Sequence, residues 1–151
     1  MKYRLHTAAF LLLSPFVWSQ IQSGRPAKQF LNRDGSQPPG YTHVVTARSG
    51  RLIFISGQGG AGRDGKLPAD FAAQAKNTFD NLSRCLSLAG ATFQDIVKIN
   101  YYVTDISNTS ELRRIRADYL NMAAPPASTL VQAGLGSGLL LEVEAIAVIP
   151  E

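Results

Sequence analysis

A carboxylate stands within an apolar stretch near the C-terminus. Glu144 lies in Leu141–Val148, where most of the residues are hydrophobic. A charged side chain in such a strand is costly to bury unless it has hydrogen-bond partners or faces a wet cleft. Because an ionised carboxylate accepts hydrogen bonds and protons, we take Glu144 as the main candidate for a functional residue.

Three other segments carry polar or conformationally permissive residues. Tyr41 follows Pro38–Gly40, Ser56-Gly57 ends one β-rich stretch, and Ser128-Thr129 begins another. Each also has a structural interpretation. Tyr41 can pack over the core, a glycine after a strand can serve backbone geometry alone, and Ser-Thr is ordinary in a strand. The residues by themselves leave both interpretations open.

Cysteine and histidine chemistry has little support. Cys85 is the single cysteine, so no internal disulfide can form, and its place on an apolar helical stripe predicts a buried small hydrophobe. The histidines are His6, near the N-terminus, and His43, at the start of a predicted strand. We therefore expect neither a metal site nor a cofactor.

The positive charge is modest and dispersed. The formal net charge is +4, and two of the positive residues belong to the N-terminal segment. The tightest group, Arg113, Arg114 and Arg116, lies on a predicted helix and is interpreted as a solvated face, with an anion or nucleic-acid patch as the alternative. We expect no nucleic-acid partner.

The first residues have the pattern of a secretory signal peptide. Lys2 and Arg4 precede a mostly apolar run, residues 7–17, and acceptable small residues precede a possible cleavage at Gln20. The run is too short to span a bilayer comfortably, which disfavours a retained anchor. We expect removal of residues 1–19, a periplasmic or secreted protein, and no membrane attachment afterwards.

The rest of the chain predicts one domain. Residues 20–29 are polar and expected to be irregular, and residues 30–151 have the length of a single domain. Periodicity and turn residues predict the order β-β-α-β-α-β-β, with an optional short strand at Phe30–Asn32 in front. The predicted strands are 42–47, 52–56, 96–103, 129–132 and 139–148.

Local signals set the boundaries of these elements. Arg48–Arg51 is expected to join the first two strands as a hairpin, and residues 57–65 to form a glycine-rich loop. Asp70 is expected to cap a helix that Gly90 ends. A second helix begins at Asn108 or Ser110, buries Leu112, Ile115 and Tyr119, and ends before Pro125-Pro126.

The predicted sheet has more apolar surface than its helices can cover. Tyr101, Tyr102 and Leu139–Leu141 all lie on predicted strands. A bare apolar face in so small a domain has to meet something, and self-assembly is the usual solution. We therefore expect a homo-oligomer.

Short motifs recur along the chain in a specific order. They are Ile55-Ser56-Gly57-Gln58, Leu88-Ala89-Gly90, Asp95-Ile96-Val97-Lys98, Val103-Thr104-Asp105, Pro126-Ala127-Ser128-Thr129 and Glu142-Val143-Glu144-Ala145-Ile146-Ala147. From about Phe30 to Ile149 the chain resembles the RidA (YjgF, endoribonuclease L-PSP) family of small trimeric enamine/imine deaminases. The resemblance implies an α/β (α+β) fold like that of chorismate mutase. This fold is a mixed β-sheet with two helices on one face, assembled as a homotrimer with ligand pockets at the subunit clefts.

The resemblance also implies roles for single residues. In the family an arginine and backbone N–H groups hold the substrate carboxylate; Ser56 and Gly57 match the backbone donors, but Ser128 stands at the place of the arginine. The backbone carbonyl of Leu130 matches the one that faces the imine nitrogen. Glu144 matches the glutamate that positions the attacking water.

The remaining implied positions surround the missing arginine. Tyr41 matches a loop tyrosine that closes the site, Thr129 follows Ser128 in the binding strand, and Arg113 stands near a family asparagine. A hydroxyl cannot neutralise a carboxylate as a guanidinium does. Either the ligand lacks a carboxylate, or another cation, Arg63 or Arg113, replaces the arginine.

Three functions follow from these observations. The resemblance implies a protein that acts on or binds a small imine, enamine or carbonyl compound, other than the standard substrate 2-aminoacrylate. A non-catalytic trimer that binds a small ligand is the alternative. Ribonuclease action needs an acid/base pair beside a phosphate-binding cluster, and one histidine after the signal with scattered arginines offers little for it.

Overall fold

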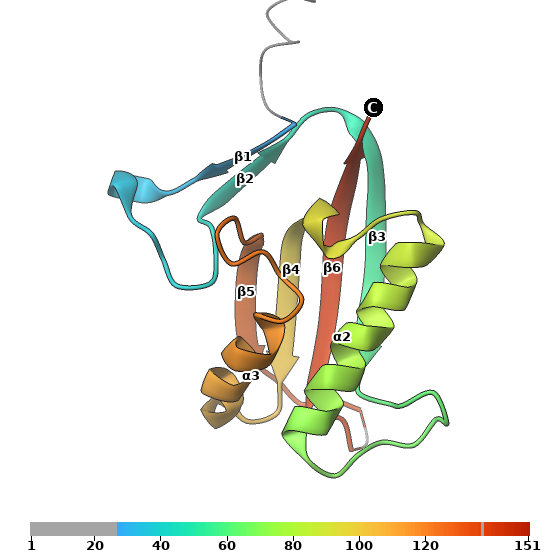
Figure 1. The fold of residues 1–151 in the computed structure, drawn as a ribbon. Coiled ribbons are helices and arrows are strands. Elements are labelled where there is room, and N and C mark those ends of the chain that lie inside the picture. Colours follow the sequence, from blue (N-terminus) through green and yellow to red (C-terminus); the bar gives the residue numbers. More distant parts are fainter. Residues whose placement is uncertain (1–26, 137) are drawn as a thin grey trace, which may run out of the picture.

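The computed structural model describes residues 27–136 and 138–151. Along the chain it has β1 (Lys28–Leu31), β2 (Val44–Ala47), β3 (Gly50–Gly59), α2 (Phe71–Leu88), β4 (Ile96–Val103), α3 (Thr109–Arg116), β5 (Ala127–Gln132) and β6 (Leu141–Pro150) (Figure 1). Short 3-10 turns are η1 (Arg33–Gly35), η2 (Phe93–Asp95) and η3 (Ile106–Asn108). The predicted order of elements is confirmed. The predicted signal peptide, residues 1–19, lies outside the described residues.

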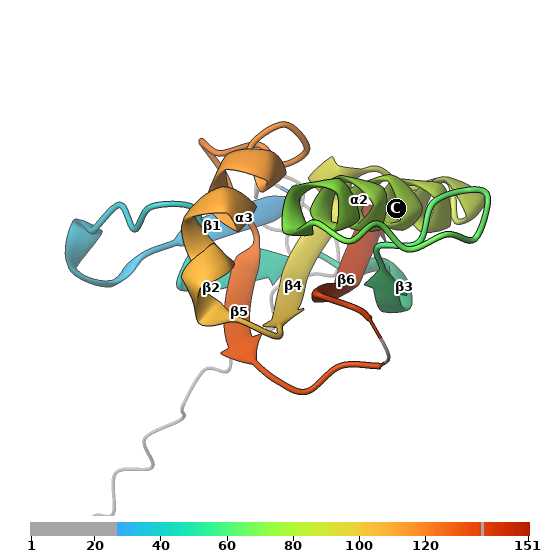
Figure 2. The ribbon, with the colours of Figure 1, turned by 90° about the horizontal axis from the view of Figure 1, so that it is seen from below.

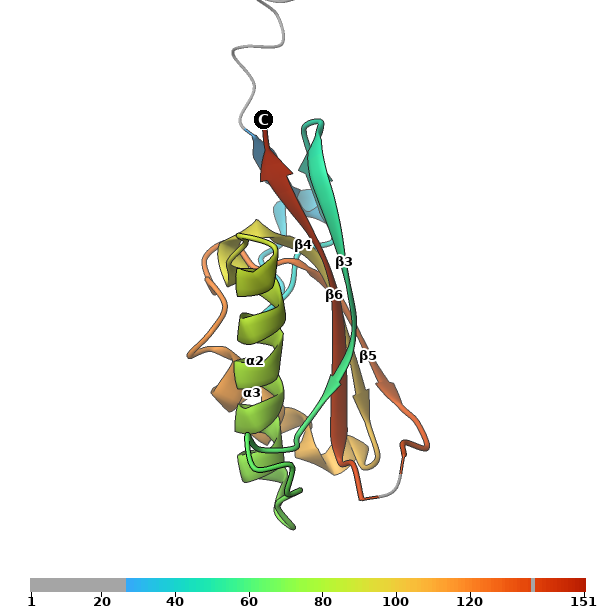
Figure 3. The same ribbon diagram turned by 90° about the vertical axis from the view of Figure 1, so that its right-hand side faces the viewer.

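Four strands form the main sheet, in the order β3-β6-β4-β5. Only β4 and β5 are parallel; the other neighbours are antiparallel. Figures 1 and 3 show α2 and α3 on the same face of this sheet, with the other face uncovered. Figure 2 shows the same two layers from below, with β1 and β2 to one side. The mixed sheet with two helices on one face is therefore confirmed, while the trimer stays a prediction.

The hairpin predicted at Arg48–Arg51, which would pair β2 with β3, is wrong. β2 pairs with β1, whose first residue is Lys28 rather than Phe30, and β3 pairs with β6 from Gly50 opposite Pro150 onward. A short glycine turn permits a hairpin, but pairing with central β6 also brings Ile55 into the core. β3 also continues to Gly59, through part of the predicted loop.

The ends of α2 follow the predicted local chemistry. The Asp70 carboxylate accepts a hydrogen bond from the Ala73 N–H at 2.8 Å, as an N-cap does. At the other end Gly90 has φ +68°, and the N–H groups of Gly90 and Ala91 donate to carbonyls of the last turn. Such a left-handed residue is costly with a Cβ, so glycine ends the helix here.

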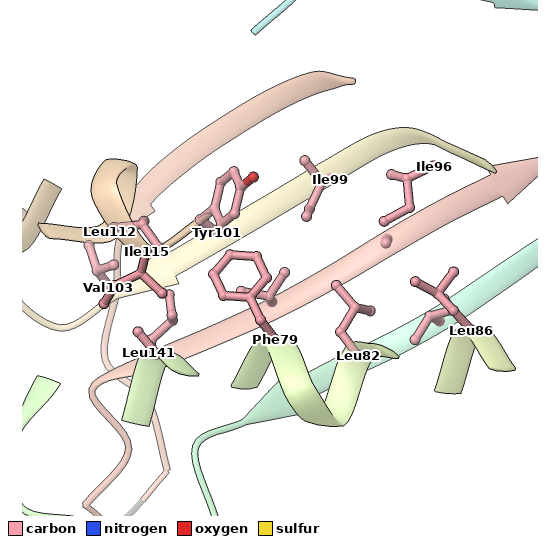
Figure 4. Packing of buried hydrophobic residues seen from close by; sticks show 14 of the residues in the cluster. Phe79, Leu82, Leu86, Ile96, Ile99, Tyr101, Val103, Leu112, Ile115 and Leu141 are labelled. Carbon is pink, nitrogen blue, oxygen red and sulfur yellow. The ribbon is translucent and has the colours of Figure 1, made fainter. Parts of the chain in front are cut away.

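The buried face of α2 is wider than the predicted stripe. The stripe predicted from the sequence consists of Phe71, Ala75, Thr78, Leu82, Cys85 and Ala89. Phe79 and Leu86 are fully buried although they lie outside it, whereas Cys85, predicted to be buried, is only half-buried. A stripe at spacings of three and four drifts across the face of a helix with 3.6 residues per turn. Figure 4 shows Phe79, Leu82 and Leu86 packed towards β4 and β6.

The second helix is shorter than predicted. α3 ends at Arg116, well before Pro125-Pro126, and its Leu112 and Ile115 are buried as predicted. Tyr119 is half-buried in the turn that follows, where its ring stacks on Phe79 with centroids 4.9 Å apart. Within the described residues no helix is long and apolar enough to cross a membrane.

The uncovered face differs from the apolar one that was predicted. Tyr101 and Leu141 are not on it, because both are buried beneath the helices. Since successive strand residues point to opposite faces, the uncovered face carries Leu52 and Phe54, 57% and 73% exposed, together with polar residues of β4 and β6. An apolar patch is present, and it comes mainly from β3.

Candidate functional site

Glu144 is held in place by two hydrogen-bond donors on the uncovered face. Asn100 lies directly opposite it in the β4–β6 register. The Asn100 side-chain amide and the Tyr102 hydroxyl each donate to Oε1 of Glu144, at 2.8 Å. These donors, first Asn100 and then Tyr102, hold the pKa of Glu144 below its usual range. The carboxylate is therefore ionised at neutral pH, with Oε2 free of hydrogen bonds from the described residues.

A hollow adjoins this carboxylate. We call it the Glu144 pocket; its volume is about 270 Å³, and Phe54, Ser56, Lys98, Asn100, Glu144 and Ile146 line it together with Ile55 and Ala145. At its edge, Lys98 Nζ donates to the Thr129 hydroxyl at 2.7 Å. The predicted residues Ser56, Thr129 and Glu144 are thus on one face.

The sequence analysis missed Lys98, Asn100 and Tyr102. They alternate along β4 with three residues of the core, Ile99, Tyr101 and Val103. This period-two pattern was the signal that could have found them, once β4 was known to neighbour β6.

Ser56 and Gly57 lie in a β-bulge opposite Glu144. Ile55 pairs with Ala145 and Gln58 with Val143, so Ser56 and Gly57 together face one residue of β6. A bulge interrupts the ladder and leaves backbone groups unpaired, consistent with the predicted backbone donors. A Cβ on Gly57 would overlap the carboxylate of Glu142 as it stands, so a larger residue here would require the Glu142 side chain to move.

A second hollow lies on the helix-covered side. We call it the Ser128 pocket; its volume is about 180 Å³, and its lining is Pro39, Tyr41, Tyr101, Thr109, Leu112, Arg113, Arg116, Ser128 and Leu130. The predicted residues Tyr41, Ser128 and Leu130 are therefore brought together. Ser128 faces this side because it pairs with the core residue Ile99, whereas Thr129 pairs with Asn100 on the other face.

One chain does not bring all the predicted site residues together. Tyr41, Ser128 and Leu130 line one pocket and Ser56 and Glu144 the other, with the sheet between them. A single subunit therefore presents two partial sites on opposite faces.

Only one of the two predicted replacement cations lies at the Ser128 pocket. Arg113 lines it, whereas Arg63 lies beside Asn77 and Asp80 in a separate surface hollow. Arg116, which the sequence analysis placed on a solvated helix face, lines the Ser128 pocket and is buried. Its spacing of four residues from buried Leu112 on the same helix was the overlooked signal.

The described residues hold no cluster of three or more histidine, cysteine or acidic side chains able to bind a metal. His43 lies outside both pocket linings, where its backbone N–H donates to the Asn32 side chain at 2.9 Å. The site therefore consists of a carboxylate with its donors on one face and arginines with hydroxyls on the other.

Comparison with known proteins assigns the chain to a family. The model of the family described as endoribonuclease L-PSP matches residues 36–149, which span both pockets. The chain belongs to the endoribonuclease L-PSP family. The resemblance to RidA proteins inferred from the short motifs is thereby confirmed.

Individual members of the L-PSP family support the same assignment. The RutC family protein YjgH of Escherichia coli is 37% identical over 74% of this chain and 86% of its own length. The E. coli 2-iminobutanoate/2-iminopropanoate deaminase is 33% identical over 66% of this chain and 80% of its own length. The crystal structure of YyfB, a Rid family protein of unknown function from Yersinia pestis, matches with a TM-score of 0.68 and 30% identity, over 82% of this chain and all of that one.

Removing one donor should shift the ionisation of Glu144. In Tyr102→Phe, which keeps the ring, we expect the pKa of Glu144 to rise, because a hydrogen bond to the charged form is lost. Carboxyl NMR titration measures this directly.

The lowered pKa of Glu144 means that the hydrogen bond from Tyr102 stabilises the fold above pH 4.5, the unperturbed value, and ceases to do so as the pH falls further. The difference in unfolding free energy between wild type and Tyr102→Phe should therefore shrink in acid.

Tyr119→Phe is the matched control. It removes a hydroxyl that donates to Asp80 at 2.9 Å, on the helix-covered side, and should leave the pKa of Glu144 unchanged. An unchanged pKa in Tyr102→Phe would show that the hydroxyl does not stabilise the charged carboxylate.

Proposed function

We propose that this L-PSP family protein hydrolyses a small imine or enamine, or acts on a related carbonyl compound, in clefts between the subunits of a homotrimer. The observation that carries the proposal is the Glu144 carboxylate. Asn100 and Tyr102 fix its Oε1, and Oε2 is left to accept a hydrogen bond from water. A carboxylate placed in this way is suited to orient a nucleophilic water and to accept its proton.

The reaction balances without a cofactor. Water adds to the carbon of the C=N bond while Glu144 accepts a proton from it and returns that proton to the nitrogen, which gives a carbinolamine. The carbinolamine hydroxyl then gives up its proton, the nitrogen gains one, and the C–N bond breaks, so the products are ammonia and a carbonyl compound. In the role that the family resemblance implies, the backbone carbonyl of Leu130 would accept a hydrogen bond from the N–H of the substrate nitrogen and so hold it in place.

The separation of the two pockets supports assembly. Glu144 and Ser128 lie on opposite faces of one sheet, so the ligand can meet both only where a second copy contributes. The exposed apolar side chains of Leu52 and Phe54, on the face that bears Glu144, suit such a contact. A homotrimer would place one composite cleft at each interface.

The ligand is proposed to differ from that of the E. coli 2-iminobutanoate/2-iminopropanoate deaminase, a relative with 33% identity. Ser128 stands where the family resemblance places the carboxylate-binding arginine. A hydroxyl makes neither the bidentate contact nor the charge pairing of a guanidinium. The smallest 2-imino acids, 2-aminoacrylate among them, should therefore be poor substrates.

Replacing Glu144 tests the hydrolytic function. In an ammonia-release assay with a panel of imines, with and without a carboxylate, we expect Glu144→Gln to lower kcat on the best substrate on the order of 10²-fold or more. Gln keeps the size of the side chain but cannot accept a proton. Glu111→Gln changes a carboxylate that pairs with Arg114 on the outside of α3, and should keep full activity.

Two results would contradict this function. Equal activity in Glu144→Gln and wild type would remove the carboxylate from the reaction. Tight binding of a carbonyl compound, without ammonia release from any imine, would favour the non-catalytic ligand-binding trimer. We do not propose ribonuclease action, because the acid/base pair that it needs is not offered by His43 and its neighbours Asn32 and Arg33.

The assembly has its own test. Sedimentation equilibrium at micromolar concentration should give a trimer for the wild type and a smaller species for Phe54→Glu, because a charge buried in an apolar contact is costly. Leu88→Glu is the control: it changes a residue 91% exposed at the outer end of α2, and should stay trimeric. A monomeric wild type would contradict the proposal.

Export is also proposed, from the composition of residues 1–19. The mature protein should be found outside the cytoplasm, with an intact mass that corresponds to a chain beginning near Gln20. A charged substitution in the middle of the apolar run, residues 7–17, should prevent processing because the run would no longer enter the membrane. Recovery of wild-type protein that still begins at Met1 would count against export.

A further inference from the structure

Arg116 is a buried cation without an anionic partner. It is only 6% exposed, and its Nε finds no hydrogen-bond partner among the described residues. Its neighbour Arg114 is paired with Glu111 at 2.7 Å, but the ion pairs within residues 27–136 and 138–151 do not include Arg116. A buried charge is usually paired, so this guanidinium calls for an explanation.

The surroundings of Arg116 fix its position without neutralising it. The guanidinium carbon lies 5.6 Å from the centroid of the Tyr101 ring, over its face. On another side is the loop at Gly40, with φ +79°, where an added Cβ would overlap the guanidinium. The Tyr101 hydroxyl is also buried without a hydrogen bond from the described residues. Two polar groups at the same place therefore lack partners.

Both groups border the Ser128 pocket. Arg113 also lines it and takes part in no ion pair of the described residues, while Ser128 and Thr109 add hydroxyls. None of the lining residues is acidic, so the pocket carries two positive charges in a volume of about 180 Å³. That volume lies below the range usual for drug-sized ligands and suits a small acid.

We infer that the Ser128 pocket binds a small oxyanion, a carboxylate or a phosphate group, with Arg116 as its principal cation and Arg113 as the second. The anion would offset the buried charge and accept hydrogen bonds from the groups that lack partners. This assignment rests on the proposed function, because it places the anionic end of the ligand in the cleft where Glu144 would act on the other end.

The assignment gives Ser128 a function in ligand binding. An arginine side chain at this position would occupy the volume that the anion needs, whereas serine leaves it open. The cation then comes from α3 instead of β5, so the anion is held at a different place relative to Glu144. A ligand whose anionic group stands at another distance from the reacting carbon would be preferred to the smallest 2-imino acids.

Calorimetric titration of the full protein tests the inference. The probes are pyruvate for a carboxylate, inorganic phosphate for a phosphate group, and acetone as the neutral control. We expect at least one of the two anions to bind and acetone not to bind. Arg116→Met, which keeps the unbranched apolar part of the side chain and removes its charge, should weaken binding of that anion at least tenfold. Whichever anion binds more tightly identifies the group that the ligand carries.

Arg114→Met is the matched control on the same helix. Arg114 is exposed and already paired with Glu111, so its loss should leave anion binding unchanged. If neither anion binds to the wild type, or if Arg116→Met binds as tightly as the wild type, the inference is wrong. Glu144→Gln should bind the anion normally, which separates a failure of anion binding from a failure of the hydrolytic function.

A second variant keeps the test decisive if Arg116→Met fails to fold. Ser128→Glu places a carboxylate in the pocket, where it can pair with the guanidinium. It should abolish anion binding and raise the melting temperature, because the buried charge is then neutralised within the chain. A lower melting temperature with undiminished anion binding would show that the pocket is not the anion site.

Discussion

The pairing of β4 with β6 is the constraint on which both pockets depend. Side chains of a strand alternate between faces, so Ile99 and Tyr101 go beneath the helices while Asn100 and Tyr102 go to the uncovered face. The register places Asn100 opposite Glu144. A slip of one residue would exchange the faces, burying the carboxylate and exposing the core. Hydrophobic burial by α2 and α3 therefore fixes the geometry of the carboxylate as well.

The charged residues on the two faces of the sheet have different environments. Glu144 is partly open to solvent and receives two donors, so it stays ionised at little cost. Arg116 lies on the covered side, against an aromatic ring, and only 6% of its surface is exposed. A cation–π contact is worth on the order of 1 kcal/mol, less than the several kcal/mol typical for desolvating a charge. The first charge is satisfied within the chain, whereas the second is left for a ligand.

The success of a prediction from the sequence depended on how far apart along the chain the interacting groups are. Asp70 and Gly90 were assigned correctly because a cap involves only neighbouring residues. The hairpin was assigned wrongly because β1 and β6 compete for β2 and β3, and a turn sequence does not decide that competition. Glu144 was found as a charge in an apolar strand. Arg116 was missed because a run of arginines suggests solvent exposure, although this one shares the buried face of α3.

The position of β5 is compatible with the proposed site between two chains. It is the edge strand of the sheet, and its adjacent residues Ser128 and Thr129 point to opposite faces. A neighbouring copy that packs around this edge can reach the Ser128 pocket without passing through the sheet. If it presents its own Glu144, the contact joins two different surfaces, and such head-to-tail contacts form a ring when the rotation between successive copies closes. In a ring, every subunit would contribute its Ser128 pocket to one cleft and its Glu144 to the neighbouring cleft. Each cleft would then combine the arginines of one copy with the carboxylate of the next.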